Sequence, residues 1–389
     1  MIHFLKRAIV VGGGIGGLSA AIALDQMGVE VTVYEQAGEV GEVGAGLILW
    51  PNAIKALRKL GLGKEVVKSG AKIFRGEICT PAGKILSGWD SGDLEFRFGA
   101  PVIAIHRADM HKILLSALPP GAIRMGMVCT GFQQDDEGVT AHFANGQSER
   151  ADLLIGADGI HSPLRRQLFP EVALRYSGYI AWRGVVAAAD ENLRGISREY
   201  WGRGKRFGIV PLGNRRIYWY ATANLPSGQT SSAAQRKETL LRHFSRWHSP
   251  LKSVAVKTVI AATPAEAILY NDIYDFPPLS QWRRGRVVLL GDAAHATTPN
   301  MGQGACMAVE SSLTLARCLA DGKDLRSSLR QYESERMPRT AWITRRSHRL
   351  GRLGQLENPI ACLLRNLLVW LTPDQVMKKS IEKAVGYEV

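Results

Sequence analysis

The chain has 389 residues, enough for two domains or for one large domain that carries an insertion. Hydrophobic residues make up 46% and charged residues 22%, without a low-complexity tract, which excludes a disordered or fibrous protein. The net charge of +14 is scattered and comes with no zinc-finger, RNP or basic-zipper pattern. We therefore expect no nucleic-acid partner and attribute the charge to attraction of anionic small molecules.

The cysteines and the start of the chain indicate where the protein works. Its five cysteines are widely spaced without a C-x-x-C pair, so we expect neither a disulfide framework nor a metal site. Met1 is followed at once by a predicted strand, which leaves no room for a signal peptide. No run reaches about 18 consecutive apolar residues, the length that spans a membrane. The sequence therefore predicts a cytoplasmic protein.

A dinucleotide-binding pattern opens the chain. Residues 8–11 form an apolar strand, and Gly12, Gly14 and Gly17 follow in the spacing G-x-G-x-x-G ahead of a predicted helix over 18–27. A second strand ends in Glu35, about 20 residues after the first glycine. The glycines permit a tight turn and a close approach of a pyrophosphate, and the carboxylate binds a ribose hydroxyl. Glutamate here favours a ribose without a 2′-phosphate.

The next two segments supply further candidate contacts. Residues 41–52, which include Ala45, form a second glycine-rich loop before an amphipathic helix over 53–60. Residues 101–105 form a predicted strand, and the helix over 107–115 starts at Arg107, which either reaches a phosphate or is solvated. Residues 123–143 read as short strands joined by turns.

Two later segments repeat the motif of an apolar strand that ends in glycine and aspartate before a helix. Residues 153–155 lead to Asp158, and residues 287–290 lead to Asp292. The second segment continues through Pro299, Gly302 and Gly304 into a helix that begins at residue 305. In open α/β sheets ligands bind at the carboxyl ends of the strands, so we expect both carboxylates at a binding site.

Between these two motifs the composition changes. Residues 179–223 are rich in β-branched and aromatic side chains that alternate, which predicts a separate antiparallel sheet, and a helix follows over 234–247. The last part of the chain, residues 311–389, is predicted to be mostly helical.

Together these motifs resemble those of the single-component FAD-dependent aromatic hydroxylases, the p-hydroxybenzoate hydroxylase-like flavoprotein monooxygenases. The glycine motif at 12–17, the Asp-Gly motif at 158–165 and the Gly-Asp motif at 291–299 match in order and cover the chain from end to end. Residues 179–182, 204–206 and 351–359 are similar to those of the salicylate-, urate- and alkylquinolone-hydroxylase-like members.

The resemblance implies an α/β fold with a Rossmann-like FAD-binding domain, an inserted antiparallel β-sheet domain for the substrate and a helical C-terminus. We expect residues 1–175, with a small β excursion, to form the first part of the FAD-binding domain and residues 176–280 to form the inserted domain. Residues 281–330 would return to the FAD-binding domain, and residues 331–389 would form the C-terminal helices.

The resemblance also implies roles for the residues singled out above. Glu35 would bind the adenosine ribose, Arg107 and Asp158 would lie near the pyrophosphate, and Asp292 would lie near the ribityl chain. Ala45, Pro299, Gly302 and Gly304 complete the expected cofactor contacts, the last three at the isoalloxazine edge, where Pro299 is also a catalytic candidate.

The implied reaction is hydroxylation of an aromatic or heteroaromatic small molecule. NADH or NADPH would reduce bound FAD, and O₂ would then form a C4a-hydroperoxyflavin that delivers one oxygen atom. Two alternatives remain open: an isoprenoid epoxidase of the same family, and a flavin-binding redox protein that hydroxylates nothing.

The resemblance to the urate-hydroxylase-like members implies that two residues of the inserted sheet, Arg206 and Tyr218, orient the substrate. Arg206 is as readily a solvated side chain, and Tyr218 is as readily a core or interface residue. His295 in the cofactor loop is a candidate proton relay, with a structural histidine the equal alternative. The basic segment 345–352 leads into the apolar segment 360–371. These residues either cover the flavin domain or form a subunit contact in a monomer or homodimer, or they touch an anionic membrane peripherally.

Overall fold

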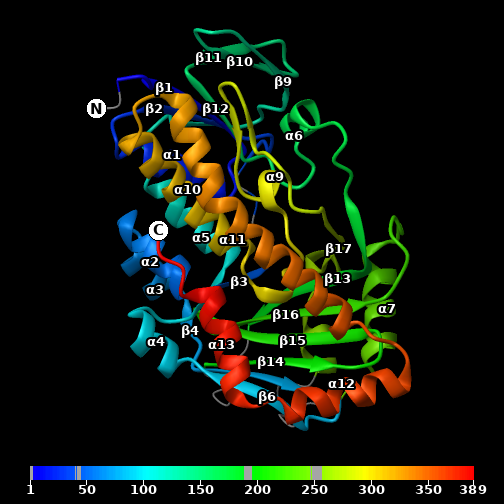
Figure 1. Ribbon diagram of the computed structural model, residues 1–389. Coiled ribbons are helices and arrows are strands. Elements are labelled where there is room, and N and C mark those ends of the chain that lie inside the picture. Colours follow the sequence, from blue (N-terminus) through cyan, green and yellow to red (C-terminus); the bar gives the residue numbers. More distant parts are fainter. Residues whose placement is uncertain (1–2, 40, 42–44, 188–194, 246, 248–255) are drawn as a thin grey trace.

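The computed structural model describes residues 3–39, 41, 45–187, 195–245, 247 and 256–389. Figure 1 shows a parallel sheet at one end of the molecule, a large antiparallel sheet at the other, and a long helix that connects the two ends. The functional site depends on how these two sheets meet.

The parallel sheet has six strands in the order β18-β19-β12-β1-β2-β8. All neighbours are parallel except β18 and β19. Buried apolar runs such as Val287–Leu289 explain the assembly, because central parallel strands are covered on both faces. The strands are β1 (Arg7–Val11), β2 (Glu30–Tyr34), β8 (Ile123–Arg124), β12 (Leu153–Gly156), β18 (Arg283–Arg284) and β19 (Val287–Leu289).

Two small sheets flank this core, each with three antiparallel strands. The first consists of β9 (Cys129–Gln134), β10 (Val139–Phe143) and β11 (Ser148–Ala151). The second consists of β3 (Gly46–Leu49), β4 (Ala71–Lys72) and β7 (Ile103–His106).

The large sheet has seven strands in the order β17-β13-β16-β15-β14-β5-β6, antiparallel except for the pair β14 and β5. Four of them overlap the region predicted to be a sheet: β13 (Arg175–Ala187), β14 (Ile196–Trp201), β15 (Lys205–Leu212) and β16 (Arg216–Ala223). A fifth, β17 (Leu269–Asp275), lies beyond the stretch for which strands were predicted. The other two, β5 (Arg75–Cys79) and β6 (Ile85–Asp90), come from a segment to which the sequence analysis assigned no strand. The domain limits stay a prediction.

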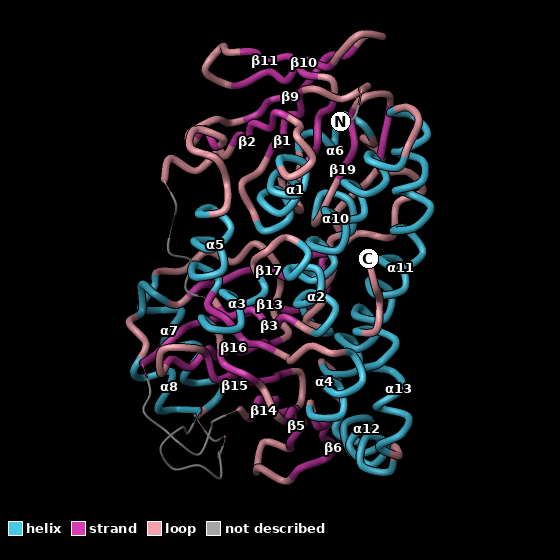
Figure 2. Tube along the Cα trace, turned by 90° about the vertical axis from the view of Figure 1, so that its left-hand side faces the viewer, coloured by secondary structure: helices cyan, strands magenta, loops and turns pink. Residues whose placement is uncertain are grey.

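Helices cover the sheets and connect them (Figure 2). In the first half of the chain they are α1 (Ile15–Asp25), α2 (Pro51–Lys59), α3 (Gly63–Ser69), α4 (Gly92–Phe98), α5 (Arg107–Ser116) and α6 (Pro163–Leu168). In the second half they are α7 (Ala233–Phe244), α8 (Val256–Ala262), α9 (Asp292–His295), α10 (Gly304–Asp321), α11 (Leu325–Gly354), α12 (Pro359–Leu371) and α13 (Asp374–Val385), with short 3-10 turns η3 (Ala265–Ala267) and η4 (Pro299–Met301).

The 30-residue helix α11 runs from the parallel sheet to the large sheet, and α12 and α13 fold back from its far end (Figures 1 and 2). Across the described part of the chain, every helix is too short or too polar to cross a membrane. The predicted fold class is confirmed: a Rossmann-like parallel sheet, a separate antiparallel sheet and a helical C-terminus.

Candidate functional site

The glycine turn after β1 is built as the spacing predicted. Gly12 has φ +106°, and a Cβ there would collide with the carbonyl oxygen of Ala157, while a Cβ on Gly17 would collide with that of Gly12. A Cβ on Gly14, by contrast, would meet no protein atom within 4 Å. The protein therefore packs tightly against Gly12 and Gly17, whereas the space beside Gly14 at the start of α1 is open.

Glu35 lies beside this turn. Its two carboxylate oxygens accept hydrogen bonds from the backbone N–H groups of Gly13 at 2.6 Å and Ala37 at 2.9 Å. These bonds hold the carboxylate at the glycine turn, where a ribose next to a pyrophosphate would lie.

Asp158 follows β12, the strand next to β1. One carboxylate oxygen accepts a hydrogen bond from the N–H of Leu164 at 3.3 Å, and the other, Oδ1, is buried without a partner among the described residues. Burial raises the pKa of Asp158. A buried acceptor without a partner is costly, which is why such an atom at a strand end indicates a ligand contact.

Asp292 follows β19, the next strand of the same sheet. The residue is exposed to solvent, yet the surrounding protein desolvates the carboxylate enough to raise its pKa, against the opposing effect of Arg107 and Arg165. Exposure together with desolvation is expected for a side chain that faces a deep recess. The N–H of Arg107 donates to the carbonyl oxygen of Ala45 at 2.8 Å, which fixes the start of α5 beside the second glycine-rich loop.

The segment from Pro299 to Gly304 carries the remaining expected cofactor contacts. Pro299 is exposed, Gly302 has φ +59°, and Gly304 is the first residue of the 18-residue helix α10. Two buried donors here have no partner among the described residues, namely Nε1 of Trp50 and Nε2 of Gln303. The segment thus presents free N–H groups and little side-chain bulk, which suits a flat ring with acceptor atoms.

One face of the large sheet packs against this segment. Tyr218 and Tyr220 of β16 are partly exposed, with ring centroids 5.9 Å apart, and they belong to the apolar cluster that includes Trp50 and Met301. Burial raises the pKa of both phenols. Gly208 accommodates the ring of Tyr220, because a Cβ on this glycine would collide with it. The two tyrosines therefore line an aromatic surface beside the cofactor segment.

Arg206 is buried rather than solvated, with 4% of the residue exposed. Its guanidinium donates to the side-chain oxygens of Gln355 at 3.0 Å, Glu199 at 3.1 Å and Asn300 at 2.7 Å. It also lies 5.5 Å from the ring centroid of Tyr179. The arginine therefore joins the sheet to the cofactor segment and to the end of α11.

Asn300, the neighbour of Pro299, is the centre of this connection. Its amide nitrogen donates to the hydroxyl of Tyr179 at 3.1 Å, to Oγ1 of Thr298 at 2.8 Å and to the carbonyl oxygen of Ser347 at 3.0 Å. The position of Pro299 is thus set by the large sheet and α11 together.

His295 points away from this group of residues. It is buried, hydrogen-bonded through Nε2 to Oγ of Ser311 at 3.1 Å, and packed 5.2 Å from the ring of Trp282. Burial and the nearby charge of Arg336 lower the pKa of His295 to about 3, so the imidazole is neutral at physiological pH. This placement favours the structural alternative over a proton relay.

The buried histidine makes folding stability depend on pH. As pH falls below 6.5, His295 of the unfolded chain becomes protonated, whereas His295 of the folded protein stays neutral until about pH 3. The contribution of neutral His295 to the free energy of unfolding is thus fully present above pH 6.5. Between pH 6.5 and about 3, each pH unit lowers the free energy of unfolding by up to about 1.4 kcal/mol. Urea unfolding of His295→Gln should show a shallower loss of stability between pH 6.5 and 4 than the parent protein. The exposed His161→Gln control should keep the parent slope.

A buried ionic network lies behind the cofactor segment. Glu310 of α10 is fully buried and accepts hydrogen bonds from Arg336 at 2.7 Å and Arg339 at 3.0 Å, and from Asn52. Burial alone would raise the pKa of Glu310, but the two arginines outweigh it and lower the pKa. Asn52 also donates to Gln303 at 3.0 Å. The carboxylate therefore fixes the residue that precedes α10.

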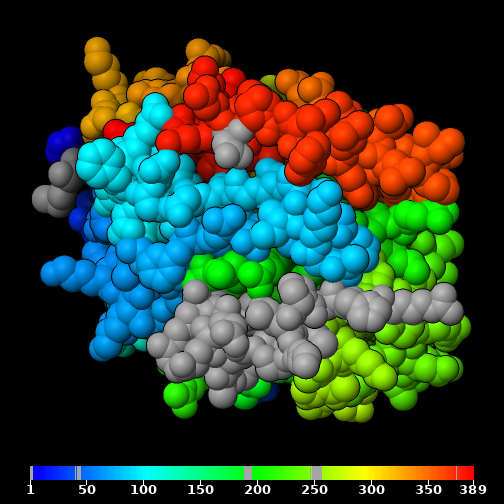
Figure 3. Space-filling view, turned by 90° about the horizontal axis from the view of Figure 1, so that it is seen from below, coloured from blue at the N-terminus to red at the C-terminus, as the bar shows by residue number. Residues whose placement is uncertain are grey.

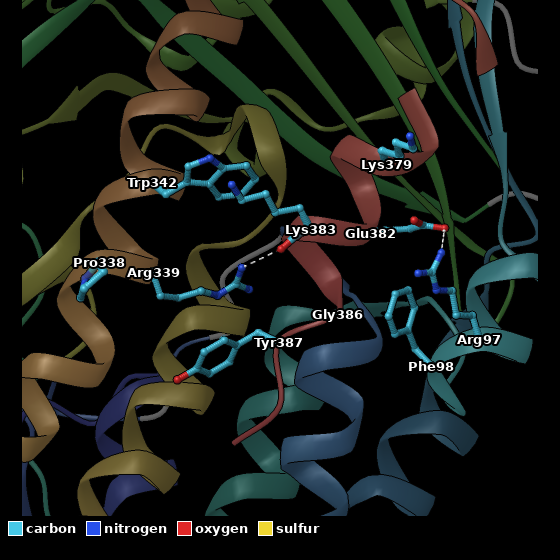
Figure 4. Close-up of a pocket in the computed structure, with 10 residues that line it drawn as sticks. All are labelled: Arg97, Phe98, Pro338, Arg339, Trp342, Lys379, Glu382, Lys383, Gly386 and Tyr387. Carbon is cyan, nitrogen blue, oxygen red and sulfur yellow. Dashed lines mark hydrogen bonds and ion pairs between the residues drawn. The ribbon is translucent and has the colours of Figure 1, made fainter. Parts of the chain in front are cut away.

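The C-terminal segment closes this network from outside. The ring of Tyr387 lies 4.9 Å from the guanidinium groups of Arg336 and Arg339. Figure 4 shows Arg339 reaching the backbone of α13 at Lys383 and Arg97 paired with Glu382. These residues line an open groove of about 720 Å³. The contacts of Arg97 and Arg339 connect α4 and α11 to α13 across this groove.

Sequence analysis did not single out Tyr220, Glu199, Asn300, Gln355 or Glu310. A signal existed for Tyr220, because side chains two residues apart in a strand share a face, so Tyr218 predicts it. Glu199 lies only seven residues from its partner Arg206, on the neighbouring strand, but no local pattern marks the pair. Asn300, Gln355 and Glu310 act through partners that are distant in sequence.

Comparisons with known proteins agree with this geometry. The family model for the FAD-binding domain matches residues 6–347. The chain is 40% identical over 361 residues to aurachin C monooxygenase/isomerase of Stigmatella aurantiaca, covering 93% of each chain. It is 35% identical over 339 residues to an FAD-dependent urate hydroxylase of Klebsiella pneumoniae, covering 86% of each.

The structure of Klebsiella pneumoniae HpxO complexed with FAD and uric acid is also similar, with a TM-score of 0.90 and 30% identity over 98% of this chain and 96% of that one. The open side of Gly14, the unpaired oxygen of Asp158 and the desolvated carboxylate of Asp292 fit FAD. The chain belongs to the family of FAD-binding monooxygenases, and it is an FAD-dependent enzyme of the aromatic hydroxylase type.

Proposed function

We propose that this enzyme uses NADH or NADPH and O₂ to place one hydroxyl group on an aromatic or heteroaromatic ring. The observation that carries the proposal is the aromatic surface of Tyr218 and Tyr220, which shares one apolar cluster with Met301 of the cofactor segment. A flat substrate would lie between this surface and the flavin. The urate and aurachin named by the relatives are candidates for its class.

The cofactor would be held along the carboxyl ends of the parallel strands. Glu35 and the glycine turn would hold the adenosine half, Arg107 and Asp158 the pyrophosphate, and Asp292 the ribityl chain. The first N–H groups of α10, after Gly304, would stabilise negative charge on the edge of the isoalloxazine ring.

When bound, FAD supplies the redox chemistry by which O₂ is activated. The protein residues would orient the ring and exclude water from the reacting atoms. Trp50, Met301, Tyr218 and Tyr220 form the apolar surroundings that this task requires. Arg206 would act as a positioning residue, because it fixes Asn300 beside Pro299 rather than facing the substrate with a free guanidinium.

The proposal predicts that a ring substrate accelerates NAD(P)H oxidation by the yellow holoprotein and gains one oxygen atom. A panel that begins with uric acid and an aurachin, assayed for NADH and NADPH oxidation, peroxide and product mass, would identify the substrate. An isoprenoid epoxidase would respond only to alkenes, and a non-hydroxylating flavoprotein would respond to no compound.

The Arg206→Lys variant is a part of the same test. Lysine is a point charge and cannot replace three divergent guanidinium hydrogen bonds. We expect bound FAD to remain, whereas the share of NAD(P)H oxidation that ends in peroxide instead of product rises several-fold. Exposed Arg215→Lys, in the turn between β15 and β16, is the matched control. Unchanged coupling in the Arg206 variant would contradict the positioning role.

A further inference from the structure

Helix α12 turns a continuous apolar face to solvent. Six side chains at the spacing i, i+3, i+4, i+7, i+8 and i+11 are between 48% and 69% exposed: Ile360, Leu363, Leu364, Leu367, Leu368 and Leu371. Trp370 beside them is 56% exposed. These seven residues are the α12 apolar face. Contiguous exposed apolar surface of this kind is rare on a soluble monomer and indicates an interaction site.

The opposite face of α12 is firmly attached to the protein. Arg365 is buried and donates to the carbonyl oxygens of Gly354 at 3.2 Å and Gly202 at 3.1 Å. Asn358 caps the first turn by accepting from the N–H groups of Ile360 and Ala361. The helix therefore presents its apolar face in a fixed orientation, next to β6 at the end of the molecule seen in Figure 3.

The surroundings of the apolar face are basic. From residue 338 to residue 373 the only acidic residue is Glu357, whereas Arg349 and Arg352 are exposed in the last turns of α11. Exposed Lys84 lies 5.5 Å from the ring of Trp370. Exposed Arg203 donates to the carbonyl oxygen of Glu357 just before α12.

We propose that the α12 apolar face docks on a lipid bilayer that contains anionic lipids. An amphipathic helix with apolar side chains on one face and basic groups around it lies in the plane of the interface, and its affinity combines apolar burial with attraction to anionic headgroups. With 13 residues, α12 is about 20 Å long, short of the roughly 30 Å hydrocarbon core, so it lies on the membrane and does not span it.

The charge pattern favours a bilayer over a second copy of the chain. A twofold contact pairs a surface with itself, so the basic rim of one copy would meet the basic rim of the other. An anionic headgroup layer complements the same rim. The proposal goes beyond the hydroxylase function and does not depend on it, because docking is measured without turnover.

The test is sedimentation of the FAD-loaded protein with vesicles of phosphatidylcholine alone or with added phosphatidylglycerol, at low and high salt. The parent protein should bind the anionic vesicles and lose affinity as salt rises. In the double variant Leu364→Gln/Leu368→Gln affinity should fall about tenfold or more, since each leucine loses its burial in the bilayer. Val128→Gln, a substitution of an exposed valine at the other end of the molecule, should bind like the parent.

Bound FAD and the unfolding midpoint of the double variant, both expected to match the parent, show that the fold is intact. Equal vesicle binding by the parent and the double variant would overturn the proposal. The proposal would also be overturned if the parent protein did not bind anionic vesicles. The same holds if the parent, without binding vesicles, formed a dimer that the double variant abolished.

Discussion

Replacement of Asp292 with alanine is expected to give a folded but largely colourless protein. The carboxylate lies just beyond the end of β19, and the surrounding protein already desolvates it, so a hydrogen bond to a cofactor hydroxyl gains strength there. Loss of one hydrogen bond to a charged group should weaken FAD binding about 10- to 100-fold. Titration of apoprotein with FAD, followed by flavin fluorescence, measures the change.

The matched control is Asp321→Ala at the C-terminal end of α10, where the side chain is exposed. This variant should bind FAD like the parent. If Asp292→Ala also purified with a full complement of FAD, the assignment of the ribityl side would be wrong.

The Glu310→Gln variant is expected to lose about 3–5 kcal/mol of folding stability, because removal of one partner from a buried ionic network leaves uncompensated charge. Arg336 is fully buried and Arg339 nearly so, and both would lose their charged acceptor. Denaturant unfolding of the FAD-free protein isolates this effect from cofactor binding.

Glu335→Gln provides the comparison for Glu310→Gln. Glu335 pairs with Arg317 on the surface, where an ion pair contributes about 1 kcal/mol or less. A similar loss of stability in both variants would contradict the role given to the Glu310 network. A second expected effect of Glu310→Gln is weaker FAD binding, since Asn52 joins the network to Gln303.

The cofactor side of the site could be predicted from the sequence because its determinants are local. The turn at Gly12 and the carboxylate of Glu35 are separated by one helix and one strand, and the short unit of strand, turn, helix and strand has one common arrangement. Asp158 and Asp292 follow apolar strands in the same way, and the structure places the first of these strands, β12, next to β1 and the second, β19, next to β12.

The substrate side could be predicted only in part. Strong alternation located the sheet, and the family resemblance pointed to Tyr218, but Arg206 takes its partners from residues 199, 300 and 355. The strands β5 and β6 join the large sheet from the first quarter of the chain. They were not predicted, because their segment lacks regular alternation. Such contacts depend on tertiary packing, which overrides local preference.

The most direct test of the hydroxylase function is the fate of labelled dioxygen. Purified FAD-loaded enzyme, supplied with NAD(P)H and the ring compound that best stimulates its oxidation, should release a product that carries one labelled oxygen atom. If NAD(P)H is consumed, peroxide accumulates and no compound in the panel acquires the label, the protein does not hydroxylate these compounds and the proposed function is contradicted.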